Sequence, residues 1–386
     1  MLREGLRHNW LLPTIPGTRY VTVGGALANN IHGKNCFNLG NIGEWVLSFS
    51  IMLASGDLLE CTRTENSDLF HAAIGGQGLL GVILTASIQM IRTPSQFVDV
   101  HEIVGDSLAA IMSSMESARE GTDFMIARLD PFAPAPHRGR GILSLGKIVT
   151  SPPGARSAEF ALDGHELSRY VFNVVPIAWS PPILKVTFGR RVARLAASLD
   201  FRSVGRFSRG RSFRESNSAY SFPMDRRLPL YNEYFRHGHF QYQPLLPKEN
   251  VATLVDEIIG MTQDCGNPSI MSGLKLPPKW RNEFPLSFDL NGYSITLDFP
   301  KKPSNVGELK ALLRALNDLV VHAGGRIYLA KNSPVDRLTL AKMYPRLEFF
   351  ERVKAQYDPR TLFQSDFYRR IFRGDARSEK YEELHL

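Results

Sequence analysis

The pattern of apolar and polar positions divides the chain into three stretches, of which the first reads as compact α/β structure. Strands are predicted at YVTVGG (20–25) and over VLSFSIMLASGDLLECT (46–62), the latter as a hairpin that turns at Ser55-Gly56-Asp57. A short helix is predicted over ENSDLFHAAIG (65–75), with Asn66 or Ser67 as its cap and Gly75 at its end. The β-rich run GVILTASIQMI (81–91) predicts another long strand.

The second stretch, from about residue 95 to 325, has the pattern of an antiparallel sheet with helices on one face. Strand-like runs occupy residues 239–247, 269–277 and 293–300, and helical patterns intervene at 249–265 and 306–325. The remaining tail is helical and charged. We therefore expect an α+β fold in three parts, which comprise residues 1–95, 96–325 and 326–386.

The formal net charge of +8 and the pI of about 9.4 indicate affinity for anions, such as nucleic acid, anionic lipid or a phosphorylated substrate. Arginines crowd the segment 201–216, whose serines and glycines predict a loop that either contacts phosphate or is simply solvated. The apolar, proline-broken run 170–186 is either core or a site for a lipid tail. The sequence has no recognisable nucleic-acid-reading module, so we expect no nucleic-acid partner.

Several classes of protein are excluded by simple counts. No apolar run is long enough to span a membrane, and the N-terminus is too polar for a secretory signal. We therefore expect a cytoplasmic location or a peripheral one at the cell membrane. Three widely spaced cysteines, Cys36, Cys61 and Cys265, make neither a zinc site nor a disulfide framework, and no metal is expected.

Two glycine-rich segments carry the candidate chemistry. GGQGLLGVI (75–83) contains Gly76, Gly78 and Gly81 in the spacing of a Rossmann dinucleotide motif, but a helix precedes it and a strand follows, which is the reverse of the required order. In VTVGGALANNIHGKN (21–35), a glycine pair is followed by the titratable His32. Glycines at such places permit positive φ or allow the backbone to approach a flat or anionic ligand closely.

Both segments resemble the vanillyl-alcohol-oxidase-type, or PCMH-type, FAD-linked flavoproteins. The resemblance rests on PGTRYVTVGGALANNIHGKN (16–35), SGDLLECTRTENSDLFHAAIGGQGLLGVI (55–83) and DPRTLFQSDFYRR (358–370). Further matching segments are FQYQ (240–243), GLKL (273–276), GYSITLDFP (292–300) and GGRIYLAKNS (324–333). The resemblance implies an FAD-binding domain, a substrate domain over 96–325, and a C-terminal segment that returns to the FAD domain.

The resemblance also implies roles for individual residues. Lys331, His32 and Tyr328 are expected to be catalytic. The residues expected to bind FAD, without a covalent bond, are Gly24, Gly25, Ala26, Gly33, Asn35, Gly76, Gly78, Leu79, Gly81 and Val82. The residues expected to bind substrate are Lys34, Gln241, Gln243, Lys275 and Thr296.

The chain departs from the family pattern near the expected cofactor edge. Cys36 and Phe37 follow the HGKN motif where histidine is usual, Gly40-Asn41-Ile42-Gly43 replaces Gly-Ser-Phe-Gly, and Thr296 stands where cysteine is common. Family members also carry a longer N-terminal part with a glycine-rich pyrophosphate loop. We therefore expect an N-terminally truncated FAD domain that binds FAD weakly by itself.

The implied reaction is oxidation of a sugar secondary alcohol to a ketone. Within the family, the chain most resembles oxidases of polyprenyl-phosphoryl ribose, which act on the 2′-hydroxyl and pass the product to a partner reductase in arabinose-donor epimerisation. A lipid phosphate is consistent with the positive charge and with peripheral membrane contact. The alternatives are an oxidase of a soluble sugar or aldonolactone and a truncated, non-catalytic remnant.

Overall fold

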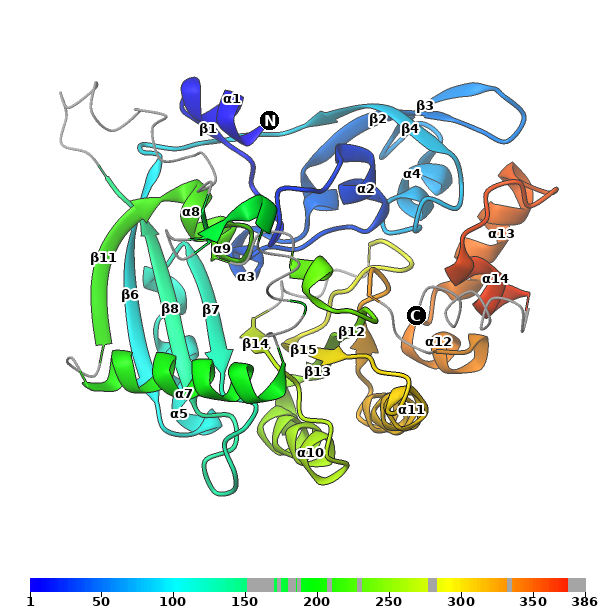
Figure 1. Ribbon diagram of the computed structural model, residues 1–386. Helices are drawn as coiled ribbons and strands as arrows, with labels where there is room; N and C mark the ends of the chain where they lie inside the picture. The colour runs from blue at the N-terminus through cyan, green and yellow to red at the C-terminus, as the bar shows by residue number, and fades with distance from the viewer. Residues whose placement is uncertain are drawn as a thin grey trace.

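The computed structural model describes the whole chain except residues 151–169, 172–174, 180–184, 186–188, 207–209, 228–230, 277–282, 332–334 and 374–386 (Figure 1). The proline cluster at 151–157 and most of the apolar run 170–186 therefore lie outside the described residues. Within the described part, no helix is long and apolar enough to cross a bilayer.

The N-terminal part corrects one sequence prediction. YVTVGG is not a strand, because helix α2 (Val23–Ala28) begins within it. Thr22 has extended backbone geometry, and its hydroxyl accepts a hydrogen bond from the Gly25 amide at 3.1 Å, which makes it an N-cap. The capping bond outweighs the β propensity of Val21 and Val23. Before α2 lie α1 (Leu2–Arg7) and β1 (Trp10–Leu11), and after it lie α3 (Cys36–Leu39) and η1 (Ile42–Trp45).

The predicted hairpin, helix and strand of residues 46–92 are confirmed. Strands β2 (Val46–Met52) and β3 (Leu58–Thr62) form the hairpin, and Gly56 in its turn has a φ of +91°. Helix α4 (Ser67–Ala73) then precedes β4 (Val82–Ile88), which pairs with the other edge of β2. The helix-before-strand order excludes a Rossmann arrangement for the intervening glycines.

The largest sheet is antiparallel and, among the described residues, contains nine strands. Its order is β11-β6-β8-β7-β14-β15-β13-β16, and β12 also pairs with β15. The bounds are β6 Phe97–Gly105, β7 Phe124–Leu129, β8 Gly141–Ile148, β11 Gly210–Ser216, β12 His239–Tyr242, β13 Pro244–Pro247, β14 Ser272–Lys275, β15 Gly292–Pro300 and β16 Arg326–Ile327. A two-residue strand, β5 (Ile91–Arg92), pairs instead with β1.

Helices lie on both faces of this sheet, which corrects the expectation of one covered face. On one face α5 (Leu108–Ser117) is tied to β15 by the Tyr293 hydroxyl, which donates to Glu116 at 2.7 Å, and α10 (Val251–Asp264) and α11 (Val306–His322) pack beside it. On the other face α7 (Arg190–Arg206) lies across β6, β8 and β11 (Figure 1). The arginine-rich segment is therefore not a loop: most of it forms the end of α7 and strand β11, whose arginines bind acidic residues of the sheet.

Short elements complete the described chain. They are η2 (Arg119–Gly121), β9 (Tyr170–Val171), β10 (Val175–Pro176), η3 (Ile177–Trp179), α8 (Asn217–Ser221), α9 (Pro223–Arg227), η4 (Tyr231–Tyr234), η5 (Lys248–Asn250), α12 (Arg337–Met343), α13 (Leu347–Tyr357) and α14 (Asp366–Phe372).

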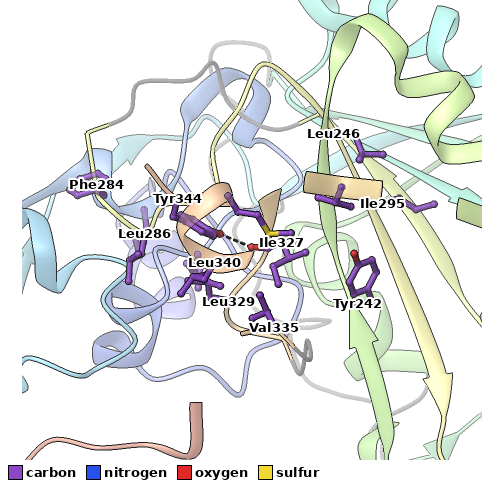
Figure 2. Packing of buried hydrophobic residues seen from close by; sticks show 14 of the residues in the cluster. Tyr242, Leu246, Phe284, Leu286, Ile295, Ile327, Leu329, Val335, Leu340 and Tyr344 are labelled. Carbon is purple, nitrogen blue, oxygen red and sulfur yellow. Dashed lines mark hydrogen bonds between the residues drawn. The ribbon is translucent and has the colours of Figure 1, made fainter. Parts of the chain in front are cut away.

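One cluster of buried apolar side chains joins the three parts of the sequence. It runs from Ala26 to Ile371 and includes residues of β2, α4, the large sheet and the C-terminal helices. Figure 2 shows the region where Ile327 of β16 meets α12 and the neighbouring strands. There the Tyr344 hydroxyl donates a hydrogen bond of 2.5 Å to the Ile327 carbonyl, so that its buried polar group is satisfied.

Candidate active site

Polar side chains line one face of the large sheet where β12 meets β15. Gln241 lies directly opposite Asp298, and Gln243 donates to the Ser294 hydroxyl at 3.0 Å. Because side chains alternate along a strand, these residues share a face of the sheet. Thr296 of β15 lies on the same face, as do the residues of β14 that are paired with Thr296 and Ser294. Polar residues at alternate positions of two buried strands need partners, so this face is built to hold something polar.

His32 is held at this face by a set of aromatic and polar neighbours. Its ring lies 5.5 Å from that of Phe288 and 5.0 Å from that of Tyr328, measured between centroids. The side-chain amide of Gln243 is hydrogen-bonded to Nε2 at 3.1 Å, which holds the orientation of the ring. Burial, Lys275 and Lys331 all lower the pKa of His32 well below its ordinary value. The imidazole is therefore neutral near pH 7 and able to accept a proton.

Two buried lysines approach the same place. Lys331 Nζ donates to Gln241 Oε1 at 2.9 Å, and Lys275 projects from β14 opposite Ser294. Burial lowers the pKa of both amines, and Asp298 acts in the opposite direction on Lys331. Lys331 also lowers the pKa of Lys275. A negative charge between the two amines would stabilise both, so this arrangement suits an anionic ligand or a charge that develops during reaction.

A buried acid and a second histidine lie behind Lys331. His239 Nε2 is 3.6 Å from Asp298 Oδ1, and neither atom has a hydrogen-bond partner among the described residues. Burial raises the pKa of Asp298 to about 6, while Gln241 and Lys331 lower it. Burial and nearby lysines lower the pKa of His239 to about 4. Near neutral pH this pair therefore consists of a carboxylate and a neutral imidazole.

A cleft of about 730 Å³ lies between the N-terminal segment, α2 and α8, and none of the polar site residues described above lines it. Ile31, the neighbour of His32, lines it, as do Thr22 and Ala26 of the glycine-rich segment. Arg19 also lines it, and the Arg19 Nε is buried without a hydrogen-bond partner among the described residues. The guanidinium of Arg19 otherwise contacts the Asp225 carboxylate and the Ser218 hydroxyl. The apolar walls and this volume fit a large dinucleotide-type cofactor such as FAD.

The glycines of the two motifs have different local causes. A side chain at Gly24 would meet no atom closer than 3.7 Å, so the packing does not itself require glycine there. At Gly25, Gly76 and Gly81 a Cβ atom would lie 2.9, 2.3 and 2.5 Å from Thr22 Oγ1, Ala72 O and Met52 O, respectively. These three glycines are explained by close packing within the chain, whereas Gly78 has a φ of +69°.

The structure brings most of the predicted catalytic and substrate residues together but sets others apart. His32, Tyr328, Lys331, Gln243 and Lys275 form one group. Close to this group, Gln241 contacts Lys331, and Thr296 lies on the same sheet face with its hydroxyl bonded to the Gly273 carbonyl. Lys34 instead points towards α8, where its amine lies over the Tyr220 ring and contacts the Tyr220 carbonyl.

Some of the residues predicted to bind FAD line the cleft, and others do not. Ala26 lines the cleft, but none of the residues 76–82 does, because Gly75 and Gln77 donate backbone hydrogen bonds to the end of α2. Gly33 lies within contact distance of the Ile15 backbone, and Asn35 donates to the Pro13 carbonyl at 2.5 Å. These two residues therefore shape the wall of the cleft from behind. Their roles towards FAD remain predictions.

Three residues of the site were missed by the sequence analysis. Asp298 lies two residues after Thr296 on its strand, and His239 lies two residues before Gln241 on another. Because every second residue of a strand faces the same side, this spacing would have placed both at the site. Phe288 lies in a segment without regular structure, and its position against His32 has no local signal in the sequence.

Comparisons with known proteins indicate the class of enzyme. The model of an FAD-binding domain matches residues 2–62, and that of D-arabinono-1,4-lactone oxidase matches residues 296–371. The chain is 29% identical over 376 residues to decaprenylphosphoryl-β-D-ribose oxidase of Mycolicibacterium smegmatis, which covers 96% of this chain and 78% of that protein.

Two further relatives show how wide the resemblance is. An uncharacterised protein in the mprA 5′ region of Streptomyces coelicolor is 28% identical over 380 residues, which covers 94% of this chain and 96% of that protein. D-arabinono-1,4-lactone oxidase of Yarrowia lipolytica is 30% identical over 99 residues, or 26% of this chain and 19% of that protein. His32 lies in the first matched domain, and Asp298, Tyr328 and Lys331 lie in the second. The matches identify the chain as an FAD-dependent oxidoreductase, and they are consistent with the PCMH-type flavoproteins.

Proposed function

We propose that the chain oxidises a secondary hydroxyl of a sugar to a ketone, and that the sugar is a polyprenyl-phosphoryl ribose oxidised at its 2′-hydroxyl. The observation that carries the reaction type is a neutral, buried His32 beside two buried lysines. Alcohol oxidation requires a group that accepts the hydroxyl proton and a fixed positive charge where negative charge develops. The site supplies both.

Each side chain has a role that follows from its contacts. FAD, when bound, supplies the acceptor for the hydride that leaves the carbinol carbon. Neutral His32 is placed to accept the hydroxyl proton at Nδ1, while Gln243 contacts Nε2 and so fixes the orientation of the ring. Lys331 would supply positive charge where negative charge develops during the reaction, and Gln241 fixes the position of its amine. Thr22, Ala26, Ile31 and the cation of Arg19 would hold the cofactor along the cleft.

The choice of substrate rests on similarity and charge. The match to decaprenylphosphoryl-β-D-ribose oxidase covers 96% of this chain, whereas the match to D-arabinono-1,4-lactone oxidase covers 26% of it. A second buried lysine, Lys275, provides a place for an anionic or strongly polar substrate group. A partner reductase that completes an epimerisation is part of this proposal.

The alternative substrate is an aldonolactone or another soluble sugar. It is favoured by the D-arabinono-1,4-lactone oxidase match over residues 296–371, which contain much of the site. The two proposals differ in whether the pocket requires a phosphorylated lipid.

The test is a substrate panel with the chain supplied with FAD. Polyprenyl-phosphoryl ribose, the same sugar without phosphate, and D-arabinono-1,4-lactone are each mixed anaerobically with the protein, and loss of oxidised flavin absorbance is followed. We expect reduction by the lipid phosphate and little by the lactone. His32→Gln should slow the reduction, while His322→Gln, at an exposed position of α11, should not. Faster reduction by the lactone would replace the proposed substrate with the alternative.

A further inference from the structure

The outer face of α7 carries an apolar stripe. Val192, Leu195 and Leu199 are 45%, 60% and 56% exposed, and their spacing of three and four residues places them on one side of the helix. The opposite side is buried against the body of the protein at Ala193 and Val204, which are 6% and 1% exposed. Long apolar side chains that repeat along an exposed helix face are unusual in a soluble domain and indicate a contact surface.

The stripe is bordered by positive charge. Arg191, Arg194 and Arg202 are exposed, and the first and third of these lie along one edge of the stripe by helical spacing. None of the three forms an ion pair with a described residue. Asp200, the acidic residue of α7, is turned towards the sheet, where it accepts a hydrogen bond from Arg128 at 3.2 Å. The outer surface of the helix is therefore both apolar and cationic.

The helix is fixed to the body of the protein by its inner face. Besides the Asp200–Arg128 pair, the guanidinium of Arg140 lies 4.5 Å from the centre of the Phe201 ring. Arg128 in turn stands opposite Gly273, and Gly273 opposite Thr296, so α7 covers the same sheet face that carries the candidate active site. Anything that binds the outer face of α7 is held on the active-site side of the sheet.

We propose that the outer face of α7, formed by Val192, Leu195, Leu199, Arg191 and Arg202, docks on an anionic lipid bilayer. An amphipathic helix lies in the plane of a membrane when apolar side chains enter the acyl boundary and flanking arginines contact lipid phosphates. The stripe is a single line of side chains on a convex helix, with charge that complements an anionic surface. Trp179 of η3, which is 66% exposed, is a further apolar side chain on the described surface. This docking is independent of the reaction proposed above.

The test is vesicle flotation of the full chain. Vesicles of phosphatidylcholine with phosphatidylglycerol are compared with vesicles of phosphatidylcholine alone, for the parent and for the double variant Leu195→Glu/Leu199→Glu. We expect binding to the anionic vesicles, at least tenfold weaker binding by the double variant, and weaker binding in high salt. Leu338→Glu, at a leucine of α12 that is 71% exposed, is the matched control and should bind like the parent.

A second pair of changes separates charge from apolar contact. Arg191→Gln/Arg202→Gln alters only exposed side chains, so its folding should be intact, and it should lose the preference for anionic vesicles. The proposal is overturned if the parent binds neither vesicle, or if both double variants bind as the parent does. It is also overturned if sedimentation shows a dimer of the parent that the leucine variant dissociates without any vesicle binding, which would assign the stripe to a second copy.

Discussion

His32 shows why the environment of a residue, and not its motif alone, decides its chemistry. The HGKN motif brings a titratable group next to a glycine-rich segment, but its neutral state follows from burial and from Lys275 and Lys331, which come from distant parts of the chain. Gln243 adds the hydrogen bond that fixes the orientation of the ring. The local sequence pattern predicts neither the burial of His32 nor these neighbours.

Lys331 is predicted to be essential for reduction of bound flavin. Its amine is buried and held by Gln241, so removing it takes away a positioned charge that solvent does not replace. Lys331→Ala should slow anaerobic reduction on the order of a hundredfold or more, measured by stopped flow. The control is Lys342→Ala, an exposed lysine of α12. A Lys331→Ala rate within about threefold of the parent, far short of that loss, would remove the residue from the mechanism.

Cys36 is predicted not to tether FAD. It is 1% exposed, its thiol lies 3.2 Å from the Leu276 carbonyl, and burial raises its pKa to about 12, so it has little thiolate character. Acid precipitation should leave the flavin in the supernatant, and alkylation of the native protein should modify the exposed Cys265 first, as read by peptide mass spectrometry. Flavin that stays with the pellet of the parent but not with that of Cys36→Ser would disprove this prediction.

Asp298 should make stability depend on pH. Burial raises its pKa from 3.8 to about 6, so the folded chain holds this proton more tightly than the unfolded chain. Its contribution to the free energy of unfolding is then complete below about pH 4 and is lost as pH rises through about 6. Asp298→Asn should therefore gain stability relative to the parent between pH 4 and pH 7.5, by about 2–3 kcal/mol at most.

Urea unfolding at the two pH values measures this difference. Asp264→Asn, which alters an exposed carboxylate in the last turn of α10, is the control and should show no such change. An equal gain for both variants, or none for Asp298→Asn, would contradict the role of burial.

At the scale of elements, hydrophobic periodicity and turn residues predicted the strands and helices that the local sequence determines. The hairpin of β2 and β3, the strands β12 to β15 and the helices α10 and α11 follow from alternation, helical spacing and turn glycines. Two segments deviate. Thr22 caps a helix inside an apparent strand, and the arginine-rich segment joins the sheet through Glu102 and Asp99, which sequence alone does not place opposite it.

The link between α13 and the glycine segment 75–81 provides a test at this scale. Lys354 is 4% exposed, contacts the Asp358 carboxylate, and donates to the carbonyls of Leu79 and Phe363 at 2.5 and 2.8 Å. Lys354→Met should lower the free energy of unfolding by about 3–5 kcal/mol, because it leaves a buried carboxylate without its cation. Urea unfolding measures the loss, with Lys342→Met on the exposed side of α12 as control. A loss no larger than that of the control would show that the pair does not hold α13 in place.

At the scale of the whole molecule, the site is assembled across the full length of the chain. His32 comes from the first part, Gln243 and Asp298 from the large sheet, and Lys331 from the segment after β16. One buried cluster holds these parts together, so a change in the core far from the site can shift its geometry. The resemblance indicated the members of this group, but their distances, the buried acid behind Lys331 and the separation of Lys34 depend on tertiary packing.

The central claim is that this assembly oxidises the 2′-position of a lipid-linked ribose. The most direct measurement is anaerobic reduction of the FAD-loaded chain by polyprenyl-phosphoryl ribose, compared with the same compound carrying deuterium at C2′. We predict that the substrate bleaches the flavin and that deuterium slows the bleaching, because the C2′–H bond breaks in that step. No bleaching by this substrate, or bleaching at the same rate with deuterium while D-arabinono-1,4-lactone reduces the flavin faster, would contradict the account.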